Sequence, residues 1–172
     1  MAQNMPNIEV IFKQKAVTAI QRSERGVVCI IVNDDTEGIA AVNKYELSSE
    51  VKEEEYTADN YRAILAAFIG VPRTVYVVKI GSTEKFADAA AAISGIDFNW
   101  LCFLKADSTE QDAVAAYIKE TNAKNKRKKR KAVVYKATTT DDMHVVNFTN
   151  EAITFKNADS LLPILVPKIL SF

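Results

Sequence analysis

Four short apolar runs recur along this chain of 172 residues and constrain its fold more than any other feature. They are VVCIIV (27–32), TVYVVKI (74–80), FNWLCFL (98–104) and AVVYKA (132–137). Each run is continuous and rich in β-branched or aromatic residues, as expected of strands that are covered on both faces. Stretches with helical spacing separate the runs, and parallel neighbours need such crossover connections. The pattern predicts an α/β domain in which helices flank a mainly parallel sheet.

Three helices are predicted between these strands, each opened by a residue whose side chain can cap a helix. The capping residues are Thr57, Ser82 and Ser108, the last with Gln111 in a capping-box pattern. Glycines at positions 70 and 95 are expected to end the first two helices, and Pro72 follows the first of them. The third helix has an apolar stripe on one side, which predicts packing against the sheet.

Both ends of the chain carry additional extended segments. Near the N-terminus, apolar and other residues alternate, which predicts an extended β arm formed by Ile8, Glu9, Val10, Ile11, Phe12 and Lys13. The charged link TAIQRSERG (18–26) leads from this arm to the first core strand. Near the other end, HVVNFTNEAITF (144–155) predicts a short β-hairpin. We therefore expect an arm and tether over 1–25, a core domain over 26–156 and an apolar tail over 157–172.

Motifs for catalysis or cofactor binding are scarce at the predicted carboxyl ends of the strands, where α/β sheets usually carry function. VNDDTEG follows the first strand in place of a glycine-rich phosphate cradle, so no nucleotide cofactor is expected. Asp34 and Asp35 offer carboxylates for Mg²⁺, but such a pair more often serves as a turn and capping device. His144 is the single histidine, and no nucleophile elbow lies near it. We therefore predict no enzyme activity, no metal and no cofactor.

The two cysteines, Cys29 and Cys102, both lie within apolar strand-like runs. A buried free thiol there behaves as a small hydrophobic side chain, so structural rather than redox roles are expected. The N-terminal sequence MAQNMPNIEV lacks the basic and apolar regions of a signal peptide. Synthesis and folding in the cytoplasm are therefore expected.

The run KNKRKKRK (124–131) holds seven basic residues in eight, although the whole chain has 22 basic and 22 acidic residues. Three interpretations remain open. The lysines can satisfy the last carbonyls of the preceding helix, or the run can dock on an acidic protein surface, or it can bind nucleic acid phosphates. The candidate docking patch comprises Lys126, Arg127, Lys128, Lys129 and Arg130. The acidic stretch SSEVKEEEY (48–56) is expected to be a solvated loop before the first helix, and the alternative is that it complements the basic run on a neighbouring subunit.

The order and spacing of several segments resemble one protein family. The segments are the arm with its link, PNIEVIFKQKAVTAIQRSERGVVCIIVND, then VYVVKIG, FNWLCFLKA and KRKAVVYKATTTDDMHVVNFTNEAITF. Together they resemble the N-terminal part of contractile tail sheath proteins from phages and phage-like bacteriocin particles of Gram-positive bacteria. The resemblance covers residues 6 to about 156.

This resemblance implies a structural protein without catalysis. Sheath subunits polymerise as stacked hexameric rings around an inner tube, and they contract when a baseplate triggers them. Their N-terminal and C-terminal arms join the sheets of neighbouring subunits, and Ile8 to Lys13 would be the N-terminal arm here. The implied partners are neighbouring subunits, the tail tube protein and the baseplate. The implied location is the tail of a virion or phage-like particle assembled in the cytoplasm of the bacterial host. Contraction is then expected to drive the tube through the target cell envelope for genome ejection.

The sequence departs from that family after Phe155. Sheath chains continue into further core and a C-terminal domain, whereas this chain ends in KNADSLLPILVPKILSF. We therefore expect residues 157–172 to be a truncation point, so that the chain is a truncated piece of a longer sheath protein, or else the chain is a short relative of that family. Two alternatives to a sheath subunit remain: a nucleic-acid-binding α/β module that uses residues 124–131, and an α/β enzyme of unrecognised type.

Overall fold

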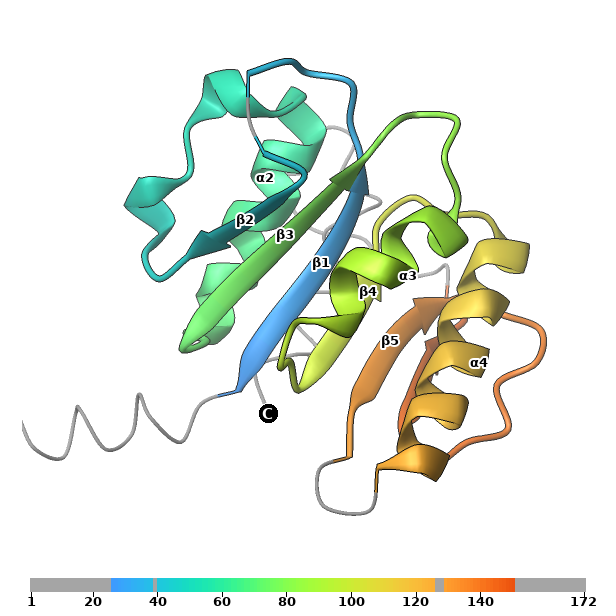
Figure 1. The fold of residues 1–172 in the computed structure, drawn as a ribbon. Coiled ribbons are helices and arrows are strands. Elements are labelled where there is room, and N and C mark those ends of the chain that lie inside the picture. Colours follow the sequence, from blue (N-terminus) through green and yellow to red (C-terminus); the bar gives the residue numbers. More distant parts are fainter. Residues whose placement is uncertain (1–25, 39, 126–128, 151–172) are drawn as a thin grey trace, which may run out of the picture.

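The computed structural model describes residues 26–38, 40–125 and 129–150, which form a six-stranded sheet with helices on both faces (Figure 1). The strand order is β2-β3-β1-β4-β5-β6, and every neighbouring pair is parallel except β2 with β3. The predicted class, an α/β fold with a mainly parallel sheet, is confirmed. The arm Ile8–Lys13, the basic residues 126–128, the second half of the expected hairpin and the apolar tail all lie outside the described residues.

All four apolar runs form strands of the sheet. The six strands are β1 (Val27–Asn33), β2 (Val42–Tyr45), β3 (Thr74–Ile80), β4 (Trp100–Phe103), β5 (Lys131–Tyr135) and β6 (Val145–Phe148). The sequence analysis missed β2 because this short edge strand reads VNKY and buries only Tyr45, so it lacks an apolar run. The first half of the expected hairpin is β6, which pairs in parallel with β5.

The helices lie where the sequence predicts, but two of them begin at a different residue. The elements are α2 (Ala58–Ala67), α3 (Phe86–Ser94) and α4 (Ser108–Lys124), with short 3₁₀ turns at Ser48–Glu50, Glu53–Glu55 and Phe68–Gly70. The predicted caps Ser82 and Ser108 are wrong. The Ser82 N–H donates instead to the Asp35 carboxylate at 2.9 Å, and α3 begins only at Phe86.

The residue that caps α4 is Asp107, whose carboxylate accepts the N–H of Glu110 at 2.9 Å. Gln111 does not form the expected capping box. Its side-chain amide donates to the Phe103 carbonyl at 2.9 Å, and its carbonyl oxygen accepts the Tyr135 N–H at 3.4 Å. A buried side chain that joins β4 to β5 therefore stands where the pattern suggested a local cap.

Each face of the sheet has its own apolar core. On one face, α3 and α4 pack through residues such as Ala89, Ile93 and Val114 against Cys29 and Ile31 of β1. On the other face, α2 packs through Ile64 and Ala67 against alternate residues of β1 and β3. Figure 1 shows α3 and α4 in front of the sheet and α2 behind it. The strands of the centre are thus buried on both faces, which explains their continuous apolar sequences.

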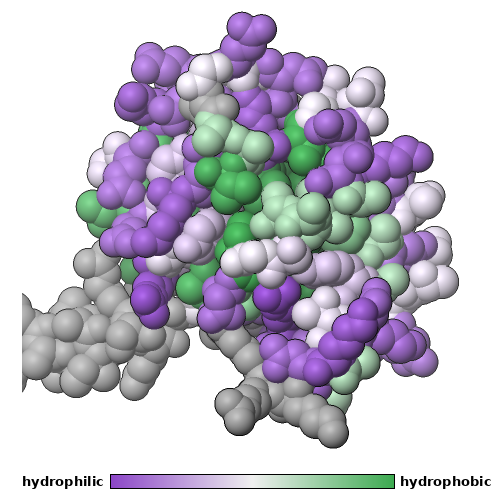
Figure 2. Space-filling model, in the orientation of Figure 1, coloured by the Kyte–Doolittle hydropathy of each residue, from purple (hydrophilic) through white to green (hydrophobic). Residues whose placement is uncertain are grey.

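The surface over α3 is the apolar part of the front view. Figure 2 shows hydrophobic residues gathered near the centre of this face, where the alanine-rich α3 and the neighbouring strand β3 reach the surface, and hydrophilic residues around its rim. Across the described ranges, no helix combines the length and apolar character needed to span a membrane.

Candidate functional site

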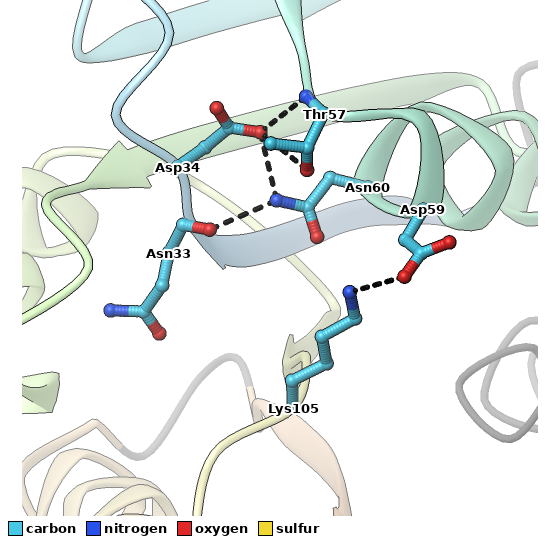
Figure 3. A network of polar contacts seen from close by, with 6 residues as sticks. All are labelled: Asn33, Asp34, Thr57, Asp59, Asn60 and Lys105. Atoms are coloured by element: carbon cyan, nitrogen blue, oxygen red, sulfur yellow. Dashed lines mark hydrogen bonds and ion pairs between the residues drawn. The ribbon is translucent and has the colours of Figure 1, made fainter.

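Asp34, directly after β1, is the centre of a polar network at the carboxyl edge of the sheet (Figure 3). Its side chain is only 3% exposed. One carboxylate oxygen accepts hydrogen bonds from the Thr57 N–H at 2.8 Å, the Thr57 hydroxyl at 3.1 Å and the Asn60 amide at 2.8 Å. The other accepts the N–H and the hydroxyl of Thr36, at 3.0 and 2.6 Å. The carboxylate therefore joins the end of β1 to the start of α2.

The network holds Asp34 in its ionised form. Burial by itself would raise the pKa of this carboxyl, but the hydrogen bonds from Thr36, Thr57 and Asn60 outweigh burial and hold the pKa well below its usual value. Thr57 is the residue before α2, as predicted, yet its hydroxyl donates to Asp34 and does not cap the helix. Asp34 therefore works as the turn and helix-anchoring device that the sequence analysis favoured for the pair Asp34 and Asp35.

Metal binding by the aspartate pair has no support in this geometry. Asp35 is exposed and accepts the Ser82 N–H, whereas both carboxylate oxygens of Asp34 already accept hydrogen bonds from protein donors. Asp59 and Lys105, close to the network, form an exposed ion pair at 3.0 Å. Among the residues that the structure describes, no group of three His, Cys, Asp or Glu side chains is placed to hold a metal ion.

His144 lies just before β6 and is bound to one carboxylate. Its Nδ1 lies 2.9 Å from an oxygen of Asp142, and the same oxygen accepts the His144 N–H at 2.8 Å. Both side chains are about four-fifths buried, at 21% and 18% exposed. A histidine and an aspartate two residues apart therefore form a local turn contact here.

The two thiols are buried in the cores, as predicted. Cys29 is fully buried on the α3 and α4 face, and burial raises its pKa to about 12 despite the opposing charge of Arg130. Cys102 is 1% exposed in the core on the α2 face, where burial and Cys29 raise its pKa. The two lie on opposite faces of the sheet, and both are free thiols.

The described end of the basic run is used inside the domain. The Lys129 ammonium donates to the Asn122 carbonyl at 2.5 Å, in the last turns of α4. Asn122 is buried, and its side chain accepts the Arg130 N–H and donates to the Arg130 carbonyl, both at 2.8 Å. These contacts match the interpretation in which a lysine satisfies the last helix carbonyls.

The Arg130 side chain is held by three different groups. Its guanidinium donates to the Ile96 carbonyl at 3.0 Å and to the Tyr117 hydroxyl at 3.3 Å, and it lies 4.4 Å from the centre of the Phe98 ring. A hollow of about 530 Å³ adjoins it, lined by Ser94, Tyr117, Thr121, Lys124, Asn125 and Arg130. Arg130 thus ties α4 to the segment between α3 and β4.

The acidic stretch is not the purely solvated loop that the sequence predicts. Val51 and Tyr56 are each 4% exposed and belong to the core on the α2 face. The Tyr56 hydroxyl lies 3.0 Å from the Tyr45 hydroxyl, which also contacts the Glu55 carboxylate at 3.1 Å. The prediction failed because Val51 and Tyr56 are separated by charged residues, so the two buried positions form no periodic apolar pattern in the sequence.

Strands β2 and β6 are the two edges of the described sheet. An edge strand presents a row of backbone groups that its own sheet does not pair, so it can accept a further strand. Each edge also carries one partly exposed valine, Val42 at 38% on β2 and Val146 at 40% on β6. These edges are the part of the domain best suited to contact another chain by strand addition.

Comparison with known proteins gives one match of note. The chain is similar to the tail sheath protein of Clostridium phage phiCD119, with 27% identity over 155 residues. The match takes in 86% of this chain and 42% of that relative, so this chain spans less than half of the relative's length. No protein-family model matches the chain. The predicted resemblance to tail sheath proteins is confirmed at this level.

Proposed function

We propose that this chain is a structural subunit of a contractile tail sheath, equivalent to the N-terminal portion of longer sheath proteins. The similarity to the phage tail sheath protein over 86% of the chain carries the proposal. In this role the protein polymerises around an inner tail tube, and contraction drives the tube through the envelope of the target cell. The particle is the tail of a phage or of a phage-like bacteriocin, assembled in the host cytoplasm.

The chemistry of the described side chains supports a structural role without catalysis. Asp34, the carboxylate with the most strongly lowered pKa, is occupied by hydrogen bonds that anchor α2. His144 is bound to Asp142, and both thiols are buried with raised pKa values. Perturbed groups at catalytic sites normally face a pocket. Here these groups are bound to neighbouring residues or buried in the two cores.

Strand addition is the proposed means of assembly. The arm Ile8–Lys13 has an apolar face formed by Ile8, Val10 and Phe12, and a lone strand cannot bury that face or satisfy its backbone groups. Pairing with the sheet of a neighbouring subunit supplies both needs. The proposed partners are therefore neighbouring sheath subunits in stacked hexameric rings, together with the tube protein and the baseplate.

Electron microscopy of the purified chain, alone and with its tube protein, tests this function. We expect rings or helical tubes of regular diameter, and we expect the tube protein to increase their number and length. A matched sample in which Val10 is replaced by proline should not assemble, because proline lacks a backbone donor and breaks a ladder. A monomer that ignores the tube protein at every concentration would contradict the proposal.

A further inference from the structure

The sheet face that carries α2 continues beyond this helix onto β5 and β6. Cys102 belongs to the core beside α2, and its partner in β5 is Val133, which in turn pairs with Val146 of β6. Tyr135 of β5 pairs with Phe148 of β6 in the same way. Because paired residues of neighbouring strands project to the same side, all four residues share the α2 face.

These four side chains are apolar or aromatic, and the charged residue that shares their face on β5, Lys131, lies over the Trp100 ring at 5.1 Å. The Tyr135 and Phe148 rings stack with their centres 6.2 Å apart, and both side chains are half-buried. Val146 is 40% exposed, an unusual fraction for a valine in the middle of a strand. Val133, beside it, is fully buried although it is not part of the core around α2. An apolar surface of this kind is usually covered by another protein segment.

The described helices do not supply that cover. The core around α2 draws its strand residues from β1, β3, β2 and β4, and none from β5 or β6. Helices α3 and α4 pack on the opposite face, against residues such as Ala132 and Val134 of β5. Figure 1 shows the same division, with α2 behind the half of the sheet that holds β2 and β3.

We propose that the apolar C-terminal segment of the same chain, LLPILVPKIL (161–170), binds this face of β5 and β6. The chain reaches the face at Phe148, the last residue of β6, so the segment that follows starts beside its binding site. Residues 149–160 can span roughly 40 Å when extended, whereas β6 itself is roughly 13 Å long, so the segment can return across both strands.

The composition of the segment suits an extended chain on a sheet face. Nine of its ten positions are Leu, Ile, Val or Pro, and Lys168 is its only charged residue. Pro163 and Pro167 oppose a long helix and remove two backbone donors that a dry sheet surface would leave unpaired. The N-terminal arm is a weaker candidate, because the charged link QRSER joins it to Gly26 at the start of β1, and β4 lies between β1 and β5.

A site-specific photocrosslink in the full-length chain tests the proposal. Val146 is replaced by the photoreactive amino acid p-benzoylphenylalanine, and crosslinked peptides are identified by mass spectrometry. We expect crosslinks within one chain to residues 161–170. The matched control carries the same replacement at Val42, which has nearly the same exposure, 38%, on the opposite edge of the sheet, and it should not give them. Crosslinks from position 146 to the N-terminal arm, to a second copy or to nothing would overturn the proposal.

A second variant leaves the sheet untouched and guards against misfolding of the first. Ile164→Asp with Leu165→Asp in the full-length chain should expose the face, increase the fluorescence of a dye that binds apolar surfaces, and leave the far-ultraviolet circular dichroism unchanged. Ile8→Asp with Val10→Asp, a control of equal charge, should not increase the dye signal. Equal dye binding by the tail variant and the parent would overturn the proposal even if the sheath function holds.

Discussion

The Asn60 side chain on α2 donates one hydrogen bond to the Asp34 carboxylate at 2.8 Å and another to the Asn33 carbonyl at 2.9 Å. One buried amide therefore binds both a side chain and a backbone carbonyl at the end of β1. These two hydrogen bonds hold the start of α2 against the sheet, so they position the apolar core between that helix and the strands.

Replacing Asp34 by Asn should destabilise the domain by about 2 to 4 kcal/mol, because the new amide group would face donors from Thr57 and Asn60. Urea denaturation measures the change in the free energy of unfolding. Asp59→Asn is the matched control, since it removes an exposed ion pair with Lys105 that contributes little. Equal losses in the two variants would contradict the structural role of Asp34.

The same carboxylate predicts how stability depends on pH. The folded-state pKa of Asp34 lies below its unfolded value of about 4, so the unfolded chain binds more protons and stability rises with pH. The contribution is complete above about pH 5 and is lost as the pH falls toward the folded-state pKa. Between pH 5 and 3 the free energy of unfolding should fall more steeply in the parent than in Asp34→Asn. Parallel slopes would show that Asp34 does not titrate differently on folding.

Arg130 should matter for stability more than for nucleic acid binding. Arg130→Gln removes the contacts with Ile96 and the Phe98 ring and should lower the melting temperature.

The combined variant Lys126→Gln, Arg127→Gln, Lys128→Gln and Lys129→Gln should not remove any specific DNA affinity, because we expect none in the parent at physiological salt. Tight DNA binding by the parent that this variant loses would instead favour a nucleic-acid-binding module.

Deleting residues 1–20 should leave a domain that unfolds cooperatively, because the described core begins at Gly26 and both of its faces are built from later residues. The deletion should weaken or abolish association between subunits if the arm joins a neighbouring sheet. Sedimentation and urea denaturation measure the two effects separately. A deletion that unfolds the domain, in a parent that never associates, would make the arm an internal strand.

Neither thiol should react in the native protein. With the Cys29 pKa raised to about 12, only about one thiol in ten thousand is ionised at pH 8, and Cys102 is equally buried. A chromogenic disulfide reagent should therefore label both cysteines only after denaturant is added. Rapid labelling of Cys102 alone in native protein would show that the α2 face of β4 opens.

Much of the fold could be predicted because its signals are local. The β-branched runs at 27–32 and 74–80 and the apolar spacing after Thr57 depend on residues that are close in the sequence, and each became the expected element. The order and spacing of several segments also predicted the resemblance to tail sheath proteins, and the comparison confirmed it. Helix starts were less secure, since Asp107 competes with its neighbour Ser108 for the capping position.

Only the tertiary structure decided the strand order and the partners of the polar groups. Asp34 meets Thr57 and Asn60 across 23 and 26 positions of sequence, and Arg130 meets Ile96 across 34. No periodicity records such pairs, because they form only when separate elements pack and buried polar groups must find donors or acceptors. The basic run therefore looked like one patch in the sequence, whereas packing turned Arg130 inward to contact α4 and the segment between α3 and β4.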